Sequence, residues 1–288
     1  MKVLVLGGGG QVARAVAACV PQNHKVVVKT RKDLDIADAA AVESALTGSE
    51  FDWIVNGAAY TAVDLAETEP EQARKINDTA VGVLARATAR AGCRLMHLST
   101  DFVFDGRSNR AYLPTDPTHP LSSYGRSKLD GEQHLLEQGG EAIILRTAWV
   151  YASTGKNFAL TMLRLMRERE EVRVVCDQIG TPTWATSIAH AIWGLMDAAA
   201  APGIYHWTDL GVATWYDFAV AIQDEALSRG LLTRAVPVVP ISTAAYPTPA
   251  QRPAFSLLNC ESARSVIPIQ AQHWRHNLRI MLDELRTA

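Results

Sequence analysis

The sequence predicts an α/β protein with a Rossmann-type doubly wound parallel sheet and a smaller C-terminal substrate-binding lobe. Apolar strand-like runs alternate with helix-forming stretches through the first half of the chain. Four glycines, Gly7 to Gly10, separate the first such run from the first helix. The alternation loosens beyond position 148. We therefore expect a dinucleotide-binding domain over residues 1–148 and a mainly substrate-binding lobe over 149–288, with later segments returning to the first domain.

The composition indicates which classes of molecule the protein is expected to bind. The chain has 288 residues, of which 48% are hydrophobic and 20% charged, enough for one large α/β unit or two linked lobes. Its formal net charge is −2 without a basic stripe, so a small molecule is expected rather than nucleic acid or a membrane surface. The apolar run at the N-terminus is too short for a signal-peptide core, and we expect a cytoplasmic protein. The four cysteines are scattered without metal-like pairing, and no metal site is predicted.

The glycine cluster is the first element that indicates a function. Val3 to Leu6 forms a continuous apolar run that predicts a buried strand, and a helix-forming stretch follows the glycines. Glycines at such a turn let backbone N–H groups approach a pyrophosphate at the positive end of the helix. The residues Gly8, Gly10 and Ala13 fit the spacing GxGxxG/A, whereas Gly7, Gly10 and Ala13 fit GxxGxxG. Both registers predict nucleotide binding, and the sequence does not decide between them.

The next strand is predicted over residues 25–29, so Arg31 and Lys32 follow its end. An NAD-type site usually carries an acid there, whereas two bases favour a 2′-phosphate and hence NADPH, with NADH still possible. Solvated surface charge is the alternative for either base. Asp35 and Ile36 are expected to border the adenine. After a helix over 39–46, a third strand over 51–56 ends in the small residues of Gly57-Ala58-Ala59-Tyr60, where a dinucleotide can cross the strand's C-terminal edge.

Hydroxyl groups follow the fourth strand. A long helix is predicted from Pro70 to Cys93, and a strand over 94–98 leads into Ser99-Thr100-Asp101. Thr100 at a strand's C-terminal end would lie in the cleft, positioned to hydrogen-bond a substrate carbonyl. A serine-threonine turn or a helix cap is the alternative.

Tyr124 and Lys128 lie four residues apart in a predicted helix and share one of its faces. The cation is expected to lower the pKa of the phenol, so that Tyr124 donates a proton to a carbonyl undergoing reduction by hydride transfer. A solvated helix face is the structural alternative.

The second half predicts fewer regular elements. These are a strand over 142–145, a helix over 157–166, a strand over 172–176, a turn over 180–183, a helix over 184–200, a strand over 203–207, a helix over 215–228, an irregular stretch over 237–253 and a final helix over 273–285.

Together these motifs resemble the extended short-chain dehydrogenases/reductases, and most closely the dTDP-4-dehydrorhamnose reductase family. The resemblance covers nearly the whole chain and is carried by NGAAYTAVDLAE, STDFVFDG, YGRSKLDGE, LRTAWVY and YPTPAQRPAFSLL. It implies reduction of the C4 ketone of dTDP-4-dehydro-L-rhamnose to dTDP-L-rhamnose for polysaccharide biosynthesis, with NADPH or NADH as the reductant. A homodimer is expected from the resemblance alone. Some members bind Mg²⁺ at a dimer contact, but no ligand cluster for it stands out here.

The resemblance also assigns residues. The catalytic residues are Thr100, Tyr124 and Lys128. The cofactor residues, including those from the motifs above, are Gly7, Gly10, Gln11, Val12, Arg31, Asp35, Ile36, Ala58, Ala59, Tyr60, Tyr124 and Lys128. The substrate residues are Val63, Thr100, Asp101 and Trp149, with Asn157 and Arg252 added as candidates for the nucleotide diphosphate. A helix cap or a loop contact is the structural alternative for the last two. Ala13, Phe102 and Ala148 depart from the usual glycine, tyrosine and serine of the family.

Two other functions remain open. A related sugar-nucleotide ketoreductase or epimerase would use the same scaffold, and an epimerase would retain its cofactor through purification. A non-catalytic subunit, similar to the β subunit of methionine adenosyltransferase, would bind NADP and a partner chain without turning over a sugar nucleotide.

Overall fold

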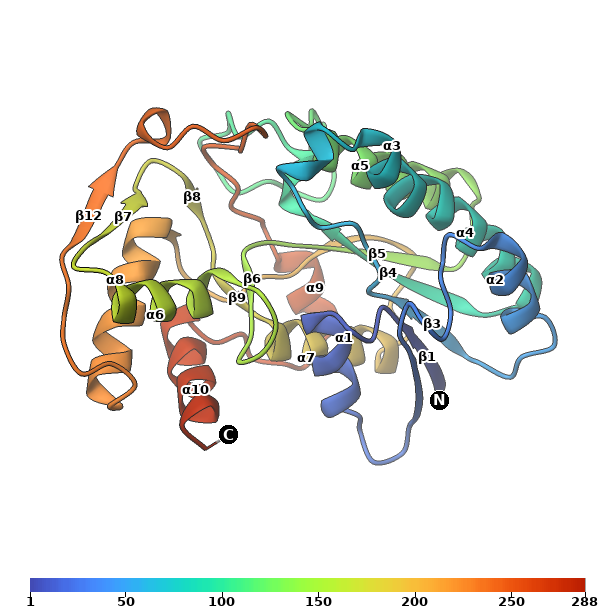
Figure 1. Ribbon diagram of the computed structural model, residues 1–288. Coiled ribbons are helices and arrows are strands. Elements are labelled where there is room, and N and C mark those ends of the chain that lie inside the picture. The colour runs from blue at the N-terminus through green and yellow to red at the C-terminus, as the bar shows by residue number, and fades with distance from the viewer. Residues whose placement is uncertain (288) are drawn as a thin grey trace.

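Six parallel strands form the central sheet of the computed structural model, which describes residues 1–287 (Figure 1). The strands run in the order β10-β5-β4-β3-β1-β2, so the predicted doubly wound sheet is confirmed. Their bounds are β1 (Lys2–Leu6), β2 (Lys25–Lys29), β3 (Trp53–Asn56), β4 (Arg94–Thr100), β5 (Ala142–Thr147) and β10 (Gly203–His206). Because the chain lays β2 and β3 on opposite sides of β1, the switch point lies at the C-terminal ends of β1 and β3, where ligands of such sheets bind.

Helices cover both faces of this sheet, and β1 shows why (Figure 1). Val3 and Val5 pack into a cluster with α1 and α7, whereas Leu4 and Leu6 pack into a second cluster with α2, α4 and α5. Successive side chains of a strand point to opposite faces, so a fully apolar strand needs cover on both. The helices concerned are α1 (Gln11–Ala18), α2 (Ala39–Leu46), α4 (Ala80–Ala91), α5 (Ser123–Glu137) and α7 (Ala185–Asp197), with α9 (Glu261–Val266) also on the α7 side.

The long helix predicted from Pro70 to Cys93 is interrupted. It consists of α3 (Pro70–Arg74), one π turn over Lys75–Thr79 and α4, which ends at Gly92 in the left-handed conformation. At this π turn α5 comes so close that a Cβ on Gly131 would lie 2.1 Å from the carbonyl oxygen of Asn77. Single π turns often occur at functional sites, and this one directs Asn77 towards the cofactor segment described below.

A separate hydrophobic cluster forms the core of the other lobe, which lies beside the sheet (Figure 1). Its helices are α6 (Phe158–Glu168), α8 (Trp215–Ser228) and α10 (Trp274–Thr287). The irregular stretch predicted over 237–253 contains β12 (Val238–Ile241), which pairs in parallel with β7 (Val172–Val175), so that prediction is wrong in this part. Short pairs join β6 (Val150–Tyr151) to β9 (Thr183–Trp184) and β8 (Ile179–Gly180) to β11 (Ala213–Thr214), and 3-10 turns lie at Leu65–Glu67, Asp101–Val103 and Thr243–Ala245.

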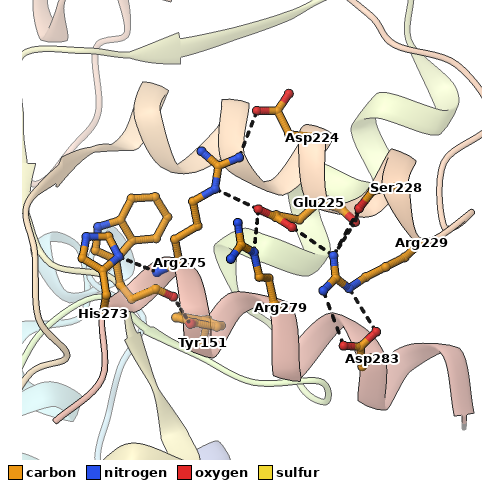
Figure 2. A network of polar contacts seen from close by, with 10 residues as sticks. Tyr151, Asp224, Glu225, Ser228, Arg229, His273, Arg275, Arg279 and Asp283 are labelled. Carbon is orange, nitrogen blue, oxygen red and sulfur yellow. Dashed lines mark hydrogen bonds and ion pairs between the residues drawn. The ribbon is translucent and has the colours of Figure 1, made fainter.

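An ion-pair network fixes α10 against α8 (Figure 2). Glu225 of α8 is largely buried and accepts hydrogen bonds from Arg229 at 2.9 Å, Arg275 at 2.8 Å and Arg279 at 2.9 Å. Arg229 also binds Asp283 at 3.0 Å. Three guanidinium groups hold the pKa of Glu225 below its usual value against the opposing effect of burial. The network therefore holds the two helices together at a site far from the sheet.

No helix within residues 1–287 combines the length and apolar character required to cross a bilayer. All four cysteines, Cys19, Cys93, Cys176 and Cys260, are free thiols.

Candidate active site

The glycine turn after β1 adopts one of the two predicted registers. Gly7 has φ +76°, and a Cβ there would lie 2.5 Å from the backbone nitrogen of Ala58. Gly10 is the N-cap of α1, and its N–H donates to the Gly7 carbonyl at 2.8 Å. Ala13 is buried against Gly57. The positive φ of Gly7 and the cap at Gly10 favour the spacing Gly7-Gly10-Ala13, and the missing side chain of Gly7 lets the turn pack directly on the Ala58 backbone.

Arg31 lies beyond the end of β2 as predicted, with its side chain exposed. Its Nε donates to Asp35 at 3.1 Å, and a hydrogen bond from the Ala37 N–H together with Arg31 lowers the pKa of the Asp35 carboxyl. Ile36 is buried in the core between the sheet and α2, so its side chain is not available to cover an adenine. The exposed Arg31 guanidinium remains suited to a phosphate.

The segment after β3 is tied to the helix that carries Tyr124. Asn77 of the π turn accepts the Tyr60 N–H at 2.8 Å and donates to the Tyr60 carbonyl at 3.0 Å. The same Asn77 amide donates to the Ser127 hydroxyl of α5 at 3.0 Å. Ala58, Ala59 and Tyr60 are thus fixed relative to α5 by one side chain.

Tyr124 lies in a closed apolar setting at the start of α5. Ser122 caps this helix by accepting the Gly125 N–H at 3.1 Å. A Cβ on Gly125 would clash with the Phe102 carbonyl oxygen, so only glycine lets the helix approach here. Phe102 meets the Tyr124 ring edge-on at 5.6 Å, and Val63 packs in the same cluster. The predicted sugar-pocket residue Val63 and the predicted acid Tyr124 are therefore brought together.

The electrostatics of Tyr124 differ from the prediction. Burial raises the pKa of Tyr124 to about 12, an effect that the Thr100 hydroxyl opposes and the Asp101 charge reinforces. Lys128 does not lower this pKa, because its Nζ donates instead to the Leu98 carbonyl at 2.6 Å and lies 3.2 Å from a histidine nitrogen of β4. In this structure the phenol is therefore fully protonated at neutral pH.

Thr100 and Asp101 form a buried pair at the end of β4. The Thr100 hydroxyl donates to Asp101 at 3.0 Å and accepts the Phe102 N–H at 3.2 Å, so it also caps the short turn that follows. Burial raises the pKa of Asp101 to about 6, against hydrogen bonds from Ser256 and Thr100 that lower it. The Thr100 side chain lies close enough to Tyr124 to lower the pKa of its phenol, as expected for two groups acting on one carbonyl oxygen.

Aromatic side chains pack together at the start of the second lobe. Trp149 has φ +48° and stacks on Trp215 with ring centroids 3.5 Å apart. Trp215, Phe158 and Arg252 line a cavity of about 580 Å³ between α6, β7 and the loop before residue 252. This size suits a small-molecule ligand.

The two diphosphate candidates differ in their surroundings. Arg252 lines the cavity, but its guanidinium is bound to Asp64. Asn157 is the N-cap of α6: it accepts the Leu160 N–H at 3.0 Å and donates to Gln11 at 2.9 Å. Asn157 is therefore a helix cap in this structure, which was the alternative to a role in phosphate binding. Its bond to Gln11 joins the second lobe to the start of α1. Val12 packs against the core beneath α1.

Three residues near the site are missing from the sequence-based assignment. Trp215 lies in the cavity wall, and Asn56 and His97 are buried on β3 and β4. A polar side chain inside an otherwise apolar parallel strand was the available signal for His97. Trp215 had no such signal, because only the tertiary fold brings it to Trp149. Within residues 1–287, no group of three or more His, Cys, Asp or Glu side chains is placed to hold a metal ion.

Comparison with known proteins gives consistent matches. The family model described as the RmlD substrate binding domain matches residues 1–287. A dTDP-4-dehydrorhamnose reductase of Burkholderia thailandensis is 43% identical over 99% of both chains. Among solved structures, a dTDP-4-dehydrorhamnose reductase of Clostridium acetobutylicum has a TM-score of 0.93 and 34% identity, covering 99% of this chain and 100% of that one. A dTDP-4-dehydrorhamnose reductase of Bacillus anthracis, solved in complex with NADP, has a TM-score of 0.92 and 32% identity, covering 98% and 99% of the chains.

Proposed function

Because the chain belongs to the dTDP-4-dehydrorhamnose reductase family, which the RmlD substrate binding domain model describes, we propose that it is an NADPH-dependent oxidoreductase that reduces the C4 ketone of dTDP-4-dehydro-L-rhamnose to dTDP-L-rhamnose. The observation that supports the proposal is that Tyr124, Thr100 and Val63 are buried close together, in a fold whose first strand and helix are joined by a glycine turn typical of dinucleotide sites.

NADPH supplies the hydride when it is bound. The backbone N–H groups at the start of α1, between Gly7 and Gly10, would hold its pyrophosphate. Arg31 would meet the 2′-phosphate with the guanidinium that its exposed side chain presents. Lys128 and the segment from Ala58 to Tyr60 would orient the nicotinamide end, as the family resemblance implies. NADH would lack only the contact to Arg31.

The proton is assigned to Tyr124. As the hydride adds to C4, the carbonyl π electrons move onto oxygen, and the Tyr124 hydroxyl donates its proton to that oxygen. A phenol with a raised pKa is a sufficient acid here, because an alkoxide is a much stronger base than a phenolate. Thr100 donates a hydrogen bond to the same oxygen and releases its bond to Asp101. The products are the C4 alcohol, NADP⁺ and a Tyr124 phenolate, which regains a proton from solvent.

The substrate is assigned to the space between the sheet and the second lobe. Val63 would contact the sugar beside Tyr124, and Trp149 would form the opposite side through its rigid stack on Trp215. The cavity at Arg252 would take the nucleotide. On this assignment the lobe from residue 149 onward binds substrate, apart from α7, β10 and α9, which pack on the sheet. A homodimer stays a prediction.

The test is to follow NADPH oxidation with enzymatically prepared dTDP-4-dehydro-L-rhamnose, with the C5-epimeric 4-keto sugar as the control. We expect rapid oxidation with the first compound, formation of dTDP-L-rhamnose and little reaction with the second. Tight NADPH binding without oxidation of either sugar would reject the proposal and favour a regulatory subunit.

A further inference from the structure

A chain of hydrogen bonds ends on the indole of Trp215. Trp215 Nε1 donates to Gln178 Oε1 at 3.1 Å, and Gln178 Nε2 donates to the Thr243 hydroxyl at 3.1 Å. The Thr243 hydroxyl donates in turn to Asp177 at 2.6 Å, and the Thr243 N–H donates to the same carboxylate at 2.8 Å. Gln178 is 6% exposed, so its amide depends on these two partners rather than on water.

Only one orientation of the Gln178 amide satisfies this chain. Desolvation raises the pKa of the Asp177 carboxyl, but the hydrogen bonds from Thr243 hold that pKa below its usual value. The carboxylate therefore only accepts, and the single proton of the Thr243 hydroxyl points at it. The lone pairs left on Thr243 need a donor, which is the Gln178 NH₂ group. The Gln178 carbonyl oxygen then faces the Trp215 N–H, which can only donate.

The backbone brings Gln178 and Trp215 side by side. The strand β8 pairs with β11 in antiparallel fashion, and Ile179 lies opposite Thr214. Gln178 precedes the first of these residues and Trp215 follows the second, so the two are the next neighbours in the same register. The hydrogen bond between their side chains is therefore supported by the pairing of the two strands.

Trp149 is enclosed between Trp215 and Gly180. The rings of the two tryptophans are only 4° from parallel, with their centroids 3.5 Å apart. A Cβ on Gly180 would lie 2.5, 2.6 and 2.8 Å from three adjacent atoms of the Trp149 indole, so the glycine lies over a face of this ring. Because Trp215 covers one face, Gly180 covers the other. Only the edge of the Trp149 indole is left for a ligand.

We infer that Gln178 is a positioning residue, which holds the Trp215 indole in one plane and thereby fixes the orientation of Trp149 at the sugar pocket. The inference rests on the proposed function, in which Trp149 forms one side of that pocket. Trp149 has φ +48°, a backbone conformation that is uncommon for residues other than glycine, so its position needs support from neighbouring elements. Without the bond to Gln178, Trp215 could turn about its side-chain bonds, and the stack that supports Trp149 would loosen.

Direct contact with the ligand is the alternative role for Gln178, because this residue also lines the cavity assigned to the nucleotide. Both ends of its amide are already bonded within the protein, which favours the positioning role. The two roles differ in what they require of Trp215. A positioning residue acts through Trp215 and has no effect of its own once the Trp215 N–H is absent, whereas a direct contact is independent of that N–H.

The first test measures the hydrogen bond itself in the unliganded, full-length protein. ¹⁵N-labelled tryptophan gives one NMR signal for each indole N–H, and the signal missing in Trp215→Phe is that of Trp215. Gln178→Met keeps a similar side-chain length without an acceptor. We expect it to speed hydrogen exchange of the Trp215 N–H about fivefold or more, the factor typical of one lost hydrogen bond. An unchanged exchange rate would overturn the inference.

The same spectra follow the stack and include a matched control. The Trp149 signal, assigned by Trp149→Phe, should shift in Gln178→Met, because stacked rings change the magnetic environment of each other's protons. Gln223 lies on α8 and accepts the Val236 N–H at 2.9 Å, so Gln223→Met removes a comparable acceptor elsewhere and should move neither tryptophan signal. A Trp149 signal that stays in place in Gln178→Met would show that Gln178 does not position Trp149.

The second test is kinetic and uses a double-mutant cycle. We expect Gln178→Met to raise KM for the sugar nucleotide about fivefold and to leave kcat and KM for NADPH within about twofold. Trp215→Phe keeps an aromatic ring without the N–H, so adding Gln178→Met to it should raise KM by less than about twofold more. Effects that multiply in full would assign Gln178 a direct contact with the ligand and overturn the inference.

The NMR readouts need no substrate, so failure of the sugar-nucleotide assay would leave them standing, and their failure would leave the reductase proposal intact. If Gln178→Met does not fold, hydrogen exchange in the unmodified protein decides. A Trp215 N–H that exchanges as slowly as a hydrogen-bonded indole supports the inference, and one that exchanges as fast as a free indole overturns it.

Discussion

Arg252 binds Asp64 with both terminal nitrogens, at 2.8 and 3.0 Å, although 188 residues separate them in the chain. The pair connects the wall of the cavity to the loop that follows β3 and carries Val63. Both side chains are partly exposed, and the pKa of Asp64 is lowered first by its hydrogen bond from Arg252. A ligand phosphate reaching this cavity would compete with Asp64 for the same guanidinium fork.

Arg252→Lys should raise KM for the sugar nucleotide about tenfold and change kcat by less than about twofold. Lysine keeps the charge but cannot bridge two oxygens in one plane, and a charge-assisted hydrogen bond is worth about that factor. Steady-state kinetics at saturating NADPH measures both constants. Arg234→Lys, at an exposed ion pair with Glu170, is the matched control and should change neither. A fall in kcat at constant KM would remove Arg252 from substrate binding.

Tyr124→Phe should lower kcat by a factor of about 100 or more, because general acid catalysis contributes on that scale. The affinity for NADPH should stay nearly constant, since the ring and its contact with Phe102 remain. Fluorescence titration gives the affinity and NADPH oxidation gives the rate. Tyr112→Phe removes a hydroxyl bound to Asp105 outside the Tyr124 pocket and serves as the control. Turnover close to the parent in Tyr124→Phe would exclude Tyr124 as the acid.

Arg31→Ala should weaken NADPH binding about tenfold or more and leave NADH binding within about twofold. The guanidinium is exposed and bonded to Asp35 only through Nε, which leaves its two terminal nitrogens for a 2′-phosphate. Binding of both cofactors is measured by titration, with Arg234→Ala, in an exposed ion pair of the second lobe, as the charge control. Equal weakening of the two cofactors would argue against a 2′-phosphate contact.

Gly7→Ala should destabilise the protein by about 1–3 kcal/mol and abolish tight cofactor binding. Its Cβ would lie 2.5 Å from the Ala58 nitrogen, and its φ of +76° is unfavourable for alanine. Gly9→Ala is a matched control two residues away, because a Cβ there has nothing within 4 Å. Thermal unfolding and NADPH titration on both variants make the comparison. Similar losses in the two variants would mean that general loop rigidity, rather than the close packing of Gly7 on Ala58, matters.

Asp101→Asn should gain stability relative to the parent as the pH rises. The folded-state pKa of Asp101 is about 6, above its ordinary value of 3.8, so the folded state binds the proton more tightly. Its contribution to stability is fully present below 3.8 and lost as the pH rises through about 6, on the order of 3 kcal/mol. Asparagine has no such loss. Unfolding at about pH 4 and about pH 8 measures the difference.

Asp209 also titrates near 6 but is present in both proteins, so the difference between them isolates position 101. A stability difference that does not vary between the two pH values would show that Asp101 is not buried as a charge.

The elements that depend on neighbouring residues could be predicted from the sequence. The apolar runs and glycines gave β1, α1 and the parallel sheet, and the helix of Tyr124 begins at Ser122 with an ordinary side-chain cap. The π turn was not predicted, because its helix has no break in its apolar stripe. The strand at Val238–Ile241 was hidden by Pro240, which a two-stranded edge tolerates.

The errors at the site share one cause. Sequence spacing placed Lys128 on the same helix face as Tyr124, and the structure keeps that face. The partners of Lys128 come instead from β4, through His97 and the Leu98 carbonyl, and a register between strands and helices is set only by the complete fold. For the same reason the burial that raises the pKa of Tyr124 was not visible in the sequence.

The π turn at Lys75–Thr79 also makes this helix tolerant of a change in length that a regular α-helix would not accept. A π turn holds about one residue more than an α turn, so removing one residue here would leave an ordinary α turn with α3 and α4 still presenting the same faces. Val81 and Leu84 would keep their places against the sheet, whereas the Asn77 carbonyl would leave Gly131. A one-residue deletion in this stretch should therefore leave the protein folded but break the tie from Asn77 to Tyr60 and Ser127, and a deletion library scored for both folding and NADPH binding should show that split.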